Sequence, residues 1–145
     1  MQNLIIRNLK VSDSEDISRI QESITKELGT IDYHGVVKEE VKKDNNVNVV
    51  AEADGKVVGF IITYILHGGF GLEKSAWIGL FGVTPKYMGS GIGKRMAKKV
   101  FDELTKMNIK NVFTSVKWDS VDLLSFFKSL GFDRCNFINL KKVID

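Results

Sequence analysis

Hydrophobic residues recur along the chain with two spacings, and these spacings predict its helices and strands. Apolar residues three or four positions apart, such as Ile17, Ile20 and Ile24, predict an amphipathic helix. Runs of apolar residues, and short stretches in which apolar and polar residues alternate, predict strands. The expected helices cover residues 13–28, 36–43, 92–107 and 121–130. The expected strands cover residues 4–8, 47–53, 56–66, 75–83, 111–116 and 135–143.

Turn residues bound these elements and indicate how they connect. Asp54-Gly55 is a strong two-residue hairpin signal between the second and third strands. Asp13 can cap the first helix, and Gly29 and Gly131 are expected to end the first and last helices. The order of elements predicts an α/β (α+β) fold, a mixed and mostly antiparallel sheet with helices on both faces. The two strands that flank the longest helix are expected to be parallel and joined by a right-handed crossover.

Length and composition are those of one folded domain. The 145 residues are 43% hydrophobic and 27% charged, which is typical of a globular protein that can bury a core. No repeat, low-complexity tract or linker interrupts the chain, so a single domain is expected over residues 1–145. The net charge of +3 is compatible with an anionic ligand but is too small to indicate nucleic acid.

The same composition bears on location and on metal binding. The N-terminus has no signal pattern, and the longest apolar stretch, Val57 to Leu66, is too short to span a membrane. Cys135 is the one cysteine, so no intramolecular disulfide can form and a cytoplasmic location is expected. Cys135 is expected to be a buried, small apolar residue of the last strand. Two histidines and one cysteine offer no metal-ligand spacing, so no metal is expected.

A glycine-rich segment between an apolar strand and the longest helix carries the clearest chemical signal. Gly89, Gly91 and Gly93 stand at every second position, where the strand gives way to the helix. The first amides of a helix have no intrahelical partner, and the helix dipole adds partial positive charge there. Glycine lets a ligand approach the backbone closely. The segment therefore predicts a phosphate or pyrophosphate site.

Two familiar phosphate loops do not fit this segment. A Walker A loop needs a glycine five residues before its Gly-Lys pair and a Ser or Thr after it, but Met88 and Arg95 stand at those places. A dinucleotide fingerprint counted from Gly91 needs a third glycine where Met96 stands.

The segment resembles the acyl-CoA loop of the GNAT N-acetyltransferases, whose motif reads Arg/Gln-x-x-Gly-x-Gly/Ala after a strand and Val-x-Pro. Residues 83–85 read Val-Thr-Pro and residues 88–93 read Met-Gly-Ser-Gly-Ile-Gly. Residues 5–13, 55–60 and 126–132 are similar to the family's first strand and helix start, its hairpin and its Tyr-Glu-Lys-Leu-Gly-Phe ending. These four landmarks follow the family's order and cover nearly the whole chain. One position departs from the family motif: a methionine begins the loop in place of Arg or Gln. The loss of this side-chain contact should weaken binding of the ligand without abolishing the site.

The resemblance implies an acetyl-CoA site between two parallel strands that splay apart. The pantetheine arm is expected to insert beside residues 81–83. The residues implied to hold the co-substrate are Phe81, Gly82, Val83, Met88, Gly89, Ser90, Gly91, Ile92, Gly93, Lys94, Ser120 and Phe127. A solvated face explains the basic residues that begin the long helix equally well. Ser120 stands where many members have an asparagine and can also cap a helix. Phe127 stands where many members carry the tyrosine that protonates the departing thiolate, which phenylalanine cannot do.

No general acid or base is assigned from the sequence. The strand expected at 75–83 has no ionisable side chain, and Trp77 stands near the place where some family members have a catalytic glutamate. Three candidates could reach a cleft: Tyr33, Tyr64 and Glu73. The two histidines, His34 and His67, are expected at the surface.

The expected function is transfer of an acetyl group from acetyl-CoA to a primary amine by direct attack in a ternary complex. The alternative is a non-catalytic GNAT-like module that binds acyl-CoA as a sensor or structural ligand. A nucleic-acid-binding domain is a weaker alternative because aromatic platforms do not accompany the basic residues. The expected partner is a small-molecule or peptide amine, with no nucleic acid and no membrane, and a homodimer is left open. Tyr33-His34-Gly35, in the variable region, could line the acceptor pocket or form a turn.

Overall fold

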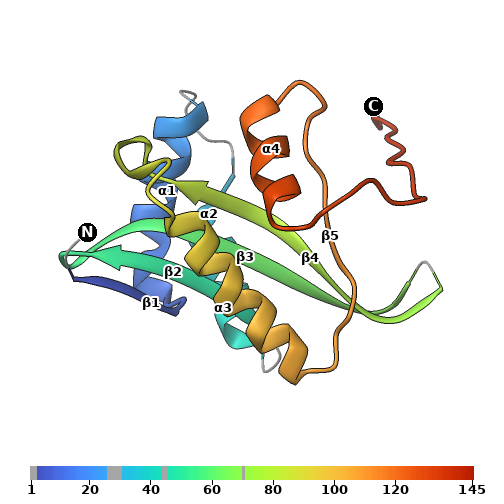
Figure 1. The fold of residues 1–145 in the computed structure, drawn as a ribbon, viewed down its shortest axis with the longest axis horizontal. Helices are drawn as coiled ribbons and strands as arrows, with labels where there is room; N and C mark the ends of the chain where they lie inside the picture. Colours follow the sequence, from blue (N-terminus) through green and yellow to red (C-terminus); the bar gives the residue numbers. More distant parts are fainter. Residues whose placement is uncertain (1–2, 26–30, 44–45, 70) are drawn as a thin grey trace. The chain divides into compact units, whose positions relative to one another are not determined.

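The computed structural model describes residues 3–25, 31–43, 46–69 and 71–145, and it divides into two units, Met1–Ser115 and Val116–Asp145. The first unit is a five-stranded sheet, in the order β1-β2-β3-β4-β5, with three helices. Its elements are β1 (Leu4–Asn8), α1 (Ser14–Thr25), α2 (Tyr33–Lys42), β2 (Val47–Ala53), β3 (Lys56–Gly69), β4 (Leu72–Val83), α3 (Ile92–Lys106) and β5 (Val112–Thr114) (Figure 1). The second unit contains α4 (Val121–Ser129). Among the described residues, no helix combines the length and the apolar composition needed to cross a bilayer.

The sheet is antiparallel from β1 to β4 and parallel between β4 and β5, so the predicted mixed sheet is confirmed. Asp54 and Gly55 join β2 to β3 with φ values of 51° and 81°, the two positive values that a type I′ hairpin turn requires. The long helix α3 connects the parallel pair, as the sequence predicts.

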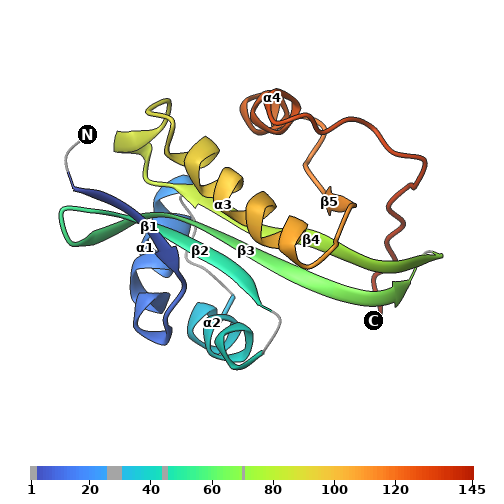
Figure 2. The ribbon, with the colours of Figure 1, turned by 60° about the horizontal axis from the view of Figure 1, so that its bottom comes forward.

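Helices cover both faces of the sheet, which also confirms the prediction (Figure 2). On one face, α1 and α2 bury Ile17, Ile20 and Val37 in a core shared with Phe60 of β3. The opposite face carries α3, because a Cβ placed on Gly59 would lie 2.9 Å from Cε of Met96. Successive strand residues point to opposite faces, so neighbouring positions of β3 meet different helices.

The start of α1 is tied to β1 by a half-buried ion pair. Arg7 donates hydrogen bonds to both carboxylate oxygens of Asp13, at 2.9 and 2.8 Å, and this contact raises the pKa of Arg7 above its ordinary value. Asp13 also accepts the N–H of Lys10 at 2.8 Å. Asp13 therefore fixes a short turn that precedes α1, and does not cap the first amides of α1 as predicted. The expected end of this helix, Leu28 and Gly29, lies outside the described residues.

Several predicted boundaries move for identifiable reasons. Helix α2 begins at Tyr33, three residues early, because Asp32 accepts the N–H of Gly35 and caps it. The Tyr33-His34-Gly35 segment is thus the first turn of a helix and not a loop turn. Strands β3 and β4 each extend further into their connecting hairpin than predicted, whereas β5 is three residues long.

The predicted last strand over residues 135–143 is wrong. This segment has no regular structure, and Cys135 is exposed, so its predicted burial is also wrong. The apolar residues here do not alternate strictly, since Phe137 and Ile138 are adjacent. Ile138 and Leu140 are 85% and 92% exposed, so the burial that would stabilise a strand is missing. The prediction that Gly131 ends the last helix is confirmed: Gly131 follows Leu130, the C-cap residue of α4, and has a φ of 96°.

Candidate active site

The glycine segment forms an open loop between the end of β4 and the start of α3 (Figure 1). Gly89 and Gly91 have φ values of 80° and 89°, which side chains rarely adopt, and a Cβ on either would meet no atom within 4 Å. Gly91 is the N-cap of α3, so the free amides of the first helical turn begin here. The loop thus combines bare backbone, open space and the positive end of a fifteen-residue helix.

The basic side chains near this loop differ in whether they are already engaged in an ion pair. Lys94 and Arg95 directly follow it and are exposed, whereas Lys98 is engaged one turn later in an ion pair with Asp102, with Nζ and Oδ2 2.9 Å apart. Met88, at the start of the loop motif, is 55% exposed. Lys94 is therefore better placed than Lys98 to pair with an anion on the loop.

A β-bulge interrupts β4 at Gly79. Ile62 of β3 pairs with Leu80 while the next residue, Thr63, pairs with Ile78, so Gly79 is an extra residue in β4. The parallel pairing of β4 with β5 ends at the same place, at Ile78 and Thr114. Thr114 closes this last pair by donating its hydroxyl to the Ile78 carbonyl at 3.0 Å. A bulge locally bends and twists its strand, which accounts for the end of the pairing between β4 and β5 at this point.

Beyond the bulge, β4 has an open edge, meaning an edge with which no described strand pairs. Residues 80–83 pair with β3, and no described strand pairs with them on the side of β5. Thr84 donates its N–H to Val58 of β3 at 2.8 Å, and backbone groups alternate between the two edges of a strand. The backbone groups of Phe81 and Val83 therefore face the open edge. The backbone groups of Gly82 face β3. The Phe60 ring and the Gln21 amide fill the space that a side chain at Gly82 would occupy.

The Tyr64 ring lies against the bulge from the face that carries α1 and α2. A Cβ placed on Gly79 would come within 2.0 Å of Cε2 of Tyr64, so only glycine leaves room for this ring. Burial raises the pKa of Tyr64, the nearby Glu40 carboxylate raises it further, and Lys43 opposes the shift. Tyr64 also lines a shallow surface cavity of about 510 Å³ beside α2, which is largely open to solvent.

The other two candidates for proton transfer lie elsewhere in the first unit. Tyr33 is buried in the core, and its hydroxyl accepts a hydrogen bond from Gln21 at 3.4 Å. Glu73 is six residues before Gly79 on β4, which corresponds to about 20 Å along a strand. His34 lies close to Ser14, with Nδ1 and Oγ 3.1 Å apart, and His67 is exposed near the end of β3.

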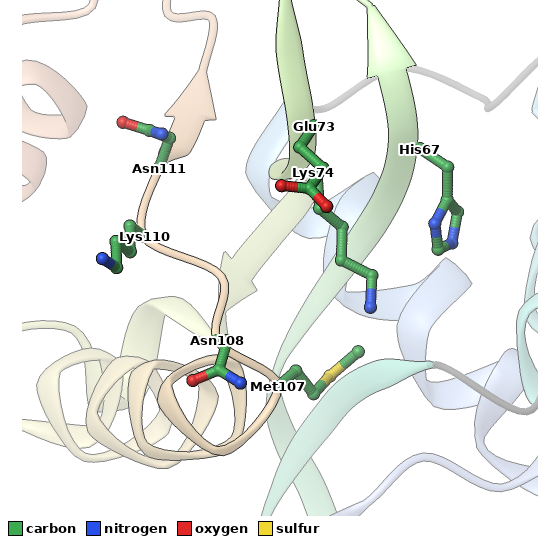
Figure 3. Close-up of a pocket in the computed structure, with 7 residues that line it drawn as sticks. All are labelled: His67, Glu73, Lys74, Met107, Asn108, Lys110 and Asn111. Carbon is green, nitrogen blue, oxygen red and sulfur yellow. The ribbon is translucent and has the colours of Figure 1, made fainter.

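Glu73 instead lines a second cavity, of about 580 Å³, at the far end of the β3–β4 hairpin. The loop that follows α3 forms its other wall. The side chains of Lys110 and Asn111 point away from those of Lys74 and His67, so the polar groups do not converge on one point (Figure 3). Among the residues that the structure describes, no three His, Cys, Asp or Glu side chains are grouped to hold a metal.

Ser120 and Phe127 belong to the second unit. Ser120 is the N-cap residue of α4, but its side chain makes no capping hydrogen bond. Phe127 is buried and packs edge-on against Phe126 and Phe132, with ring centroids 5.3 and 5.1 Å apart. Phe127 thus contributes to the apolar packing of its own unit, and its predicted contact with the pantetheine arm stays a prediction.

Sequence comparison identifies the family to which this arrangement belongs. The family model described as "Acetyltransferase (GNAT) family" matches residues 14–132, most of the chain. The chain belongs to the GNAT acetyltransferase family. A mycothiol acetyltransferase from Amycolatopsis mediterranei (strain U-32) is 28% identical over 88 residues, which are 59% of this chain and 29% of that relative. The aligned region thus spans less than a third of the relative's length.

Solved structures of acetyltransferases share the fold. An aminoglycoside acetyltransferase from an uncultured soil metagenomic sample, in complex with trehalose, superposes with a TM-score of 0.81 at 20% identity, covering 98% of this chain and 97% of that one. AAC(6')-Iy, in complex with a CoA-containing bisubstrate analogue, gives a TM-score of 0.84 at 15% identity, covering 99% and 100%. A ribosomal-protein-alanine N-acetyltransferase from Brucella melitensis biovar Abortus 2308 gives 0.76 at 16% identity, covering 98% and 99%.

Sequence reasoning missed the role of Gly79. The available signal was a glycine inside an otherwise apolar strand, which often marks a bulge or a close approach of another group. The contribution of Glu40 and Lys43 to the surroundings of Tyr64 had no sequence signal, because these residues are brought together by the packing of α2 on the sheet.

Proposed function

We propose that the protein transfers the acetyl group of acetyl-CoA to a primary amine. The observation that carries this proposal is the edge of β4 with which no described strand pairs, because it leads directly into the glycine loop and the backbone groups of Val83 point toward it. An extended ligand with amide groups, such as pantetheine, can add to such an edge as an extra strand. The CoA pyrophosphate is the kind of anion that the amides at the start of α3 can bind.

The proposed chemistry is direct attack in a ternary complex. The amine nitrogen attacks the thioester carbonyl carbon, the C–N bond forms, and the C–S bond breaks to release CoA as the thiol. The backbone N–H of Val83, on the open edge, is suited to polarise the carbonyl oxygen. No covalent intermediate with the protein is needed, and the main contribution of the site is to hold the two substrates in reacting positions.

The proposed acceptor is a small molecule or a peptide that carries a primary amine. The cavity on the α2 side of the sheet is lined by Tyr64, whose ring also packs on the bulge at Gly79, so we place the acceptor there, apart from the glycine loop. The first acceptors to test are aminoglycosides and peptides with an N-terminal alanine, because similar solved structures include an aminoglycoside acetyltransferase and a ribosomal-protein-alanine N-acetyltransferase.

An assay of acetyl-CoA consumption against a panel of amines and peptide N-termini tests this function. We expect turnover with at least one acceptor and a rise in melting temperature with CoA, since a ligand that binds the folded state stabilises it. Stabilisation by CoA without turnover on any amine would favour the non-catalytic acyl-CoA-binding module. Absence of both would contradict the proposed site.

Lys94→Glu is expected to weaken CoA binding about tenfold, because it replaces a cation beside the loop with an anion. If Lys94 contacts the 3′-phosphate, dephospho-CoA should lose less affinity than CoA. Lys106→Glu, at the opposite end of α3, is the matched control and should leave both affinities unchanged. Calorimetric titration of both ligands measures the difference. Tight binding of duplex DNA at physiological salt, lost in Lys94→Glu, would instead favour a nucleic-acid ligand.

A further inference from the structure

We propose that Tyr64 moves the proton during acetyl transfer, relaying it from the attacking nitrogen to the departing sulfur. The proposal rests on the N-acetyltransferase function proposed above. It assigns a step that residues 75–83 of β4 cannot perform, because none of them carries an ionisable side chain. It also supplies the proton donor that Phe127 cannot provide.

The position of the ring is the first support. A Cβ on Gly79 would lie 2.0 Å from Cε2 of Tyr64 and 3.1 Å from Cζ, the carbon that bears the hydroxyl. Tyr64 belongs to β3, so its ring must extend from β3 over the backbone of β4 to occupy this space. Gly79 directly follows Ile78, the last residue of β4 that pairs with β5. The hydroxyl end of the ring therefore lies near the point where the edge of β4 becomes open.

Access from the acceptor side is the second support. The cavity of about 510 Å³ beside α2 has Tyr64 in its wall, together with Val36 and Gly35 of α2. The open edge of β4, where we place the thioester, lies just beyond Gly79. An amine in the cavity and a thioester on the edge would both lie close to the phenol, as a relay between them requires.

The charges around the ring keep the phenol protonated. Glu40 is buried, with its carboxylate 2.6 Å from Nζ of Lys43, and the same Nζ lies 5.7 Å from the centre of the Tyr64 ring. Burial and Glu40 raise the pKa of Tyr64, and Lys43 only partly opposes them. The other charged groups that line the cavity are Asp32, Lys38 and Glu39. Tyr64 is therefore a proton donor at neutral pH.

The proton balance of the proposed step closes without any further reactant. As the C–S bond breaks, the Tyr64 hydroxyl gives its proton to the sulfur, which leaves as a thiol. The nitrogen becomes strongly acidic once it has formed the C–N bond, and it returns a proton to the phenol oxygen. Tyr64 ends the cycle in its starting state, and the products are the amide and CoA.

Tyr64→Phe tests the proposal, because it removes the hydroxyl and keeps the ring that packs on Gly79. We expect kcat to fall about 100-fold, the range for loss of a general acid–base group, while the Kd for acetyl-CoA and the melting temperature stay unchanged. Tyr33→Phe is the matched control, since it removes the hydroxyl of a buried tyrosine of α2 that packs on the same sheet face as the half-buried Tyr64. Its kcat should change no more than about twofold, well below the loss expected at Tyr64.

The pH dependence of kcat separates proton transfer from a packing role. If the Tyr64 phenol must be protonated, the enzyme loses activity as the pH rises through the pKa of Tyr64, which lies above the usual value of about 10. Wild-type kcat should fall on that alkaline limb, and the residual activity of Tyr64→Phe should lack it. If the wild type acetylates an amine and Tyr64→Phe has the same kcat, or shows the same alkaline limb, the proposed role of Tyr64 is overturned while the acetyltransferase function stands. If the wild type binds CoA but acetylates no amine, both proposals fail together.

Discussion

Replacing Gly91 with aspartate is expected to abolish detectable CoA binding while the protein stays folded. Gly91 is the N-cap of α3, and the space beside its Cα is open, so an added side chain would stand at the surface of the loop. A carboxylate there would repel the pyrophosphate at the point where the helix amides and dipole favour an anion. We expect affinity to fall at least about 100-fold, which corresponds to about 2.7 kcal/mol. A thermal-shift titration with CoA measures the loss.

Gly91→Asn is the matched control for this experiment. Asparagine has the shape of aspartate without its charge, and it tolerates the positive φ of 89° better than most residues. The difference between the two variants therefore reports the charge and not the backbone strain. This difference should shrink as salt rises, because exposed charges are screened. Equal CoA affinity of the Asp and Asn variants at low salt would show that the anion binds elsewhere.

The sequence predicts most of the first unit because its signals are local. Apolar spacing and turn residues determine each helix and strand, and the Asp54-Gly55 turn adopts the two positive φ values that its sequence predicts. The glycine loop is also a local feature, since positive φ at Gly89 and Gly91 requires glycine whatever surrounds it. Fold class and the loop between β4 and α3 could therefore be predicted from the chain alone.

Features that depend on distant partners could not be predicted in this way. The bulge at Gly79 is defined by the register with β3, and the proximity of Tyr64 to Glu40 and Lys43 is set by how α2 packs. The wrong strand over residues 135–143 has the same origin. Its composition permits a strand, but a strand also needs a partner and burial, and Leu140 is 92% exposed.

The separation of Tyr33, Tyr64 and Glu73 shows what the structure adds to the search for a catalytic group. All three are plausible by residue type, but only Tyr64 contacts the bulge of β4. Glu73 is about 20 Å away along the same strand, at the far end of the hairpin. Residue type suggests the chemistry, whereas the position along the strand decides which residue can take part in it.

Amines of low pKa are expected to be the preferred acceptors at neutral pH. Attack requires the neutral amine, and residues 75–83 of β4 offer no carboxylate to remove its proton, since none of them is ionisable. At pH 7 an α-amine of pKa about 8 is neutral about one time in ten, whereas a lysine amine of pKa about 10.4 is neutral about four times in ten thousand. The available neutral form thus differs by roughly 200-fold.

Two peptides of one sequence measure this effect, one with a free N-terminus and a blocked lysine, the other with the reverse. We expect kcat/KM at pH 7 to favour the free N-terminus by up to about 200-fold, and the ratio to fall to about 3.5 at pH 10, where the α-amine is almost fully neutral and roughly 30% of the lysine amine is neutral. Tyr64 does not alter this ratio, because it acts only after the nitrogen has attacked. A lysine peptide that is used equally well at pH 7, with a flat pH profile, would contradict the expectation, because it would require a protein base that lowers the pKa of the bound amine.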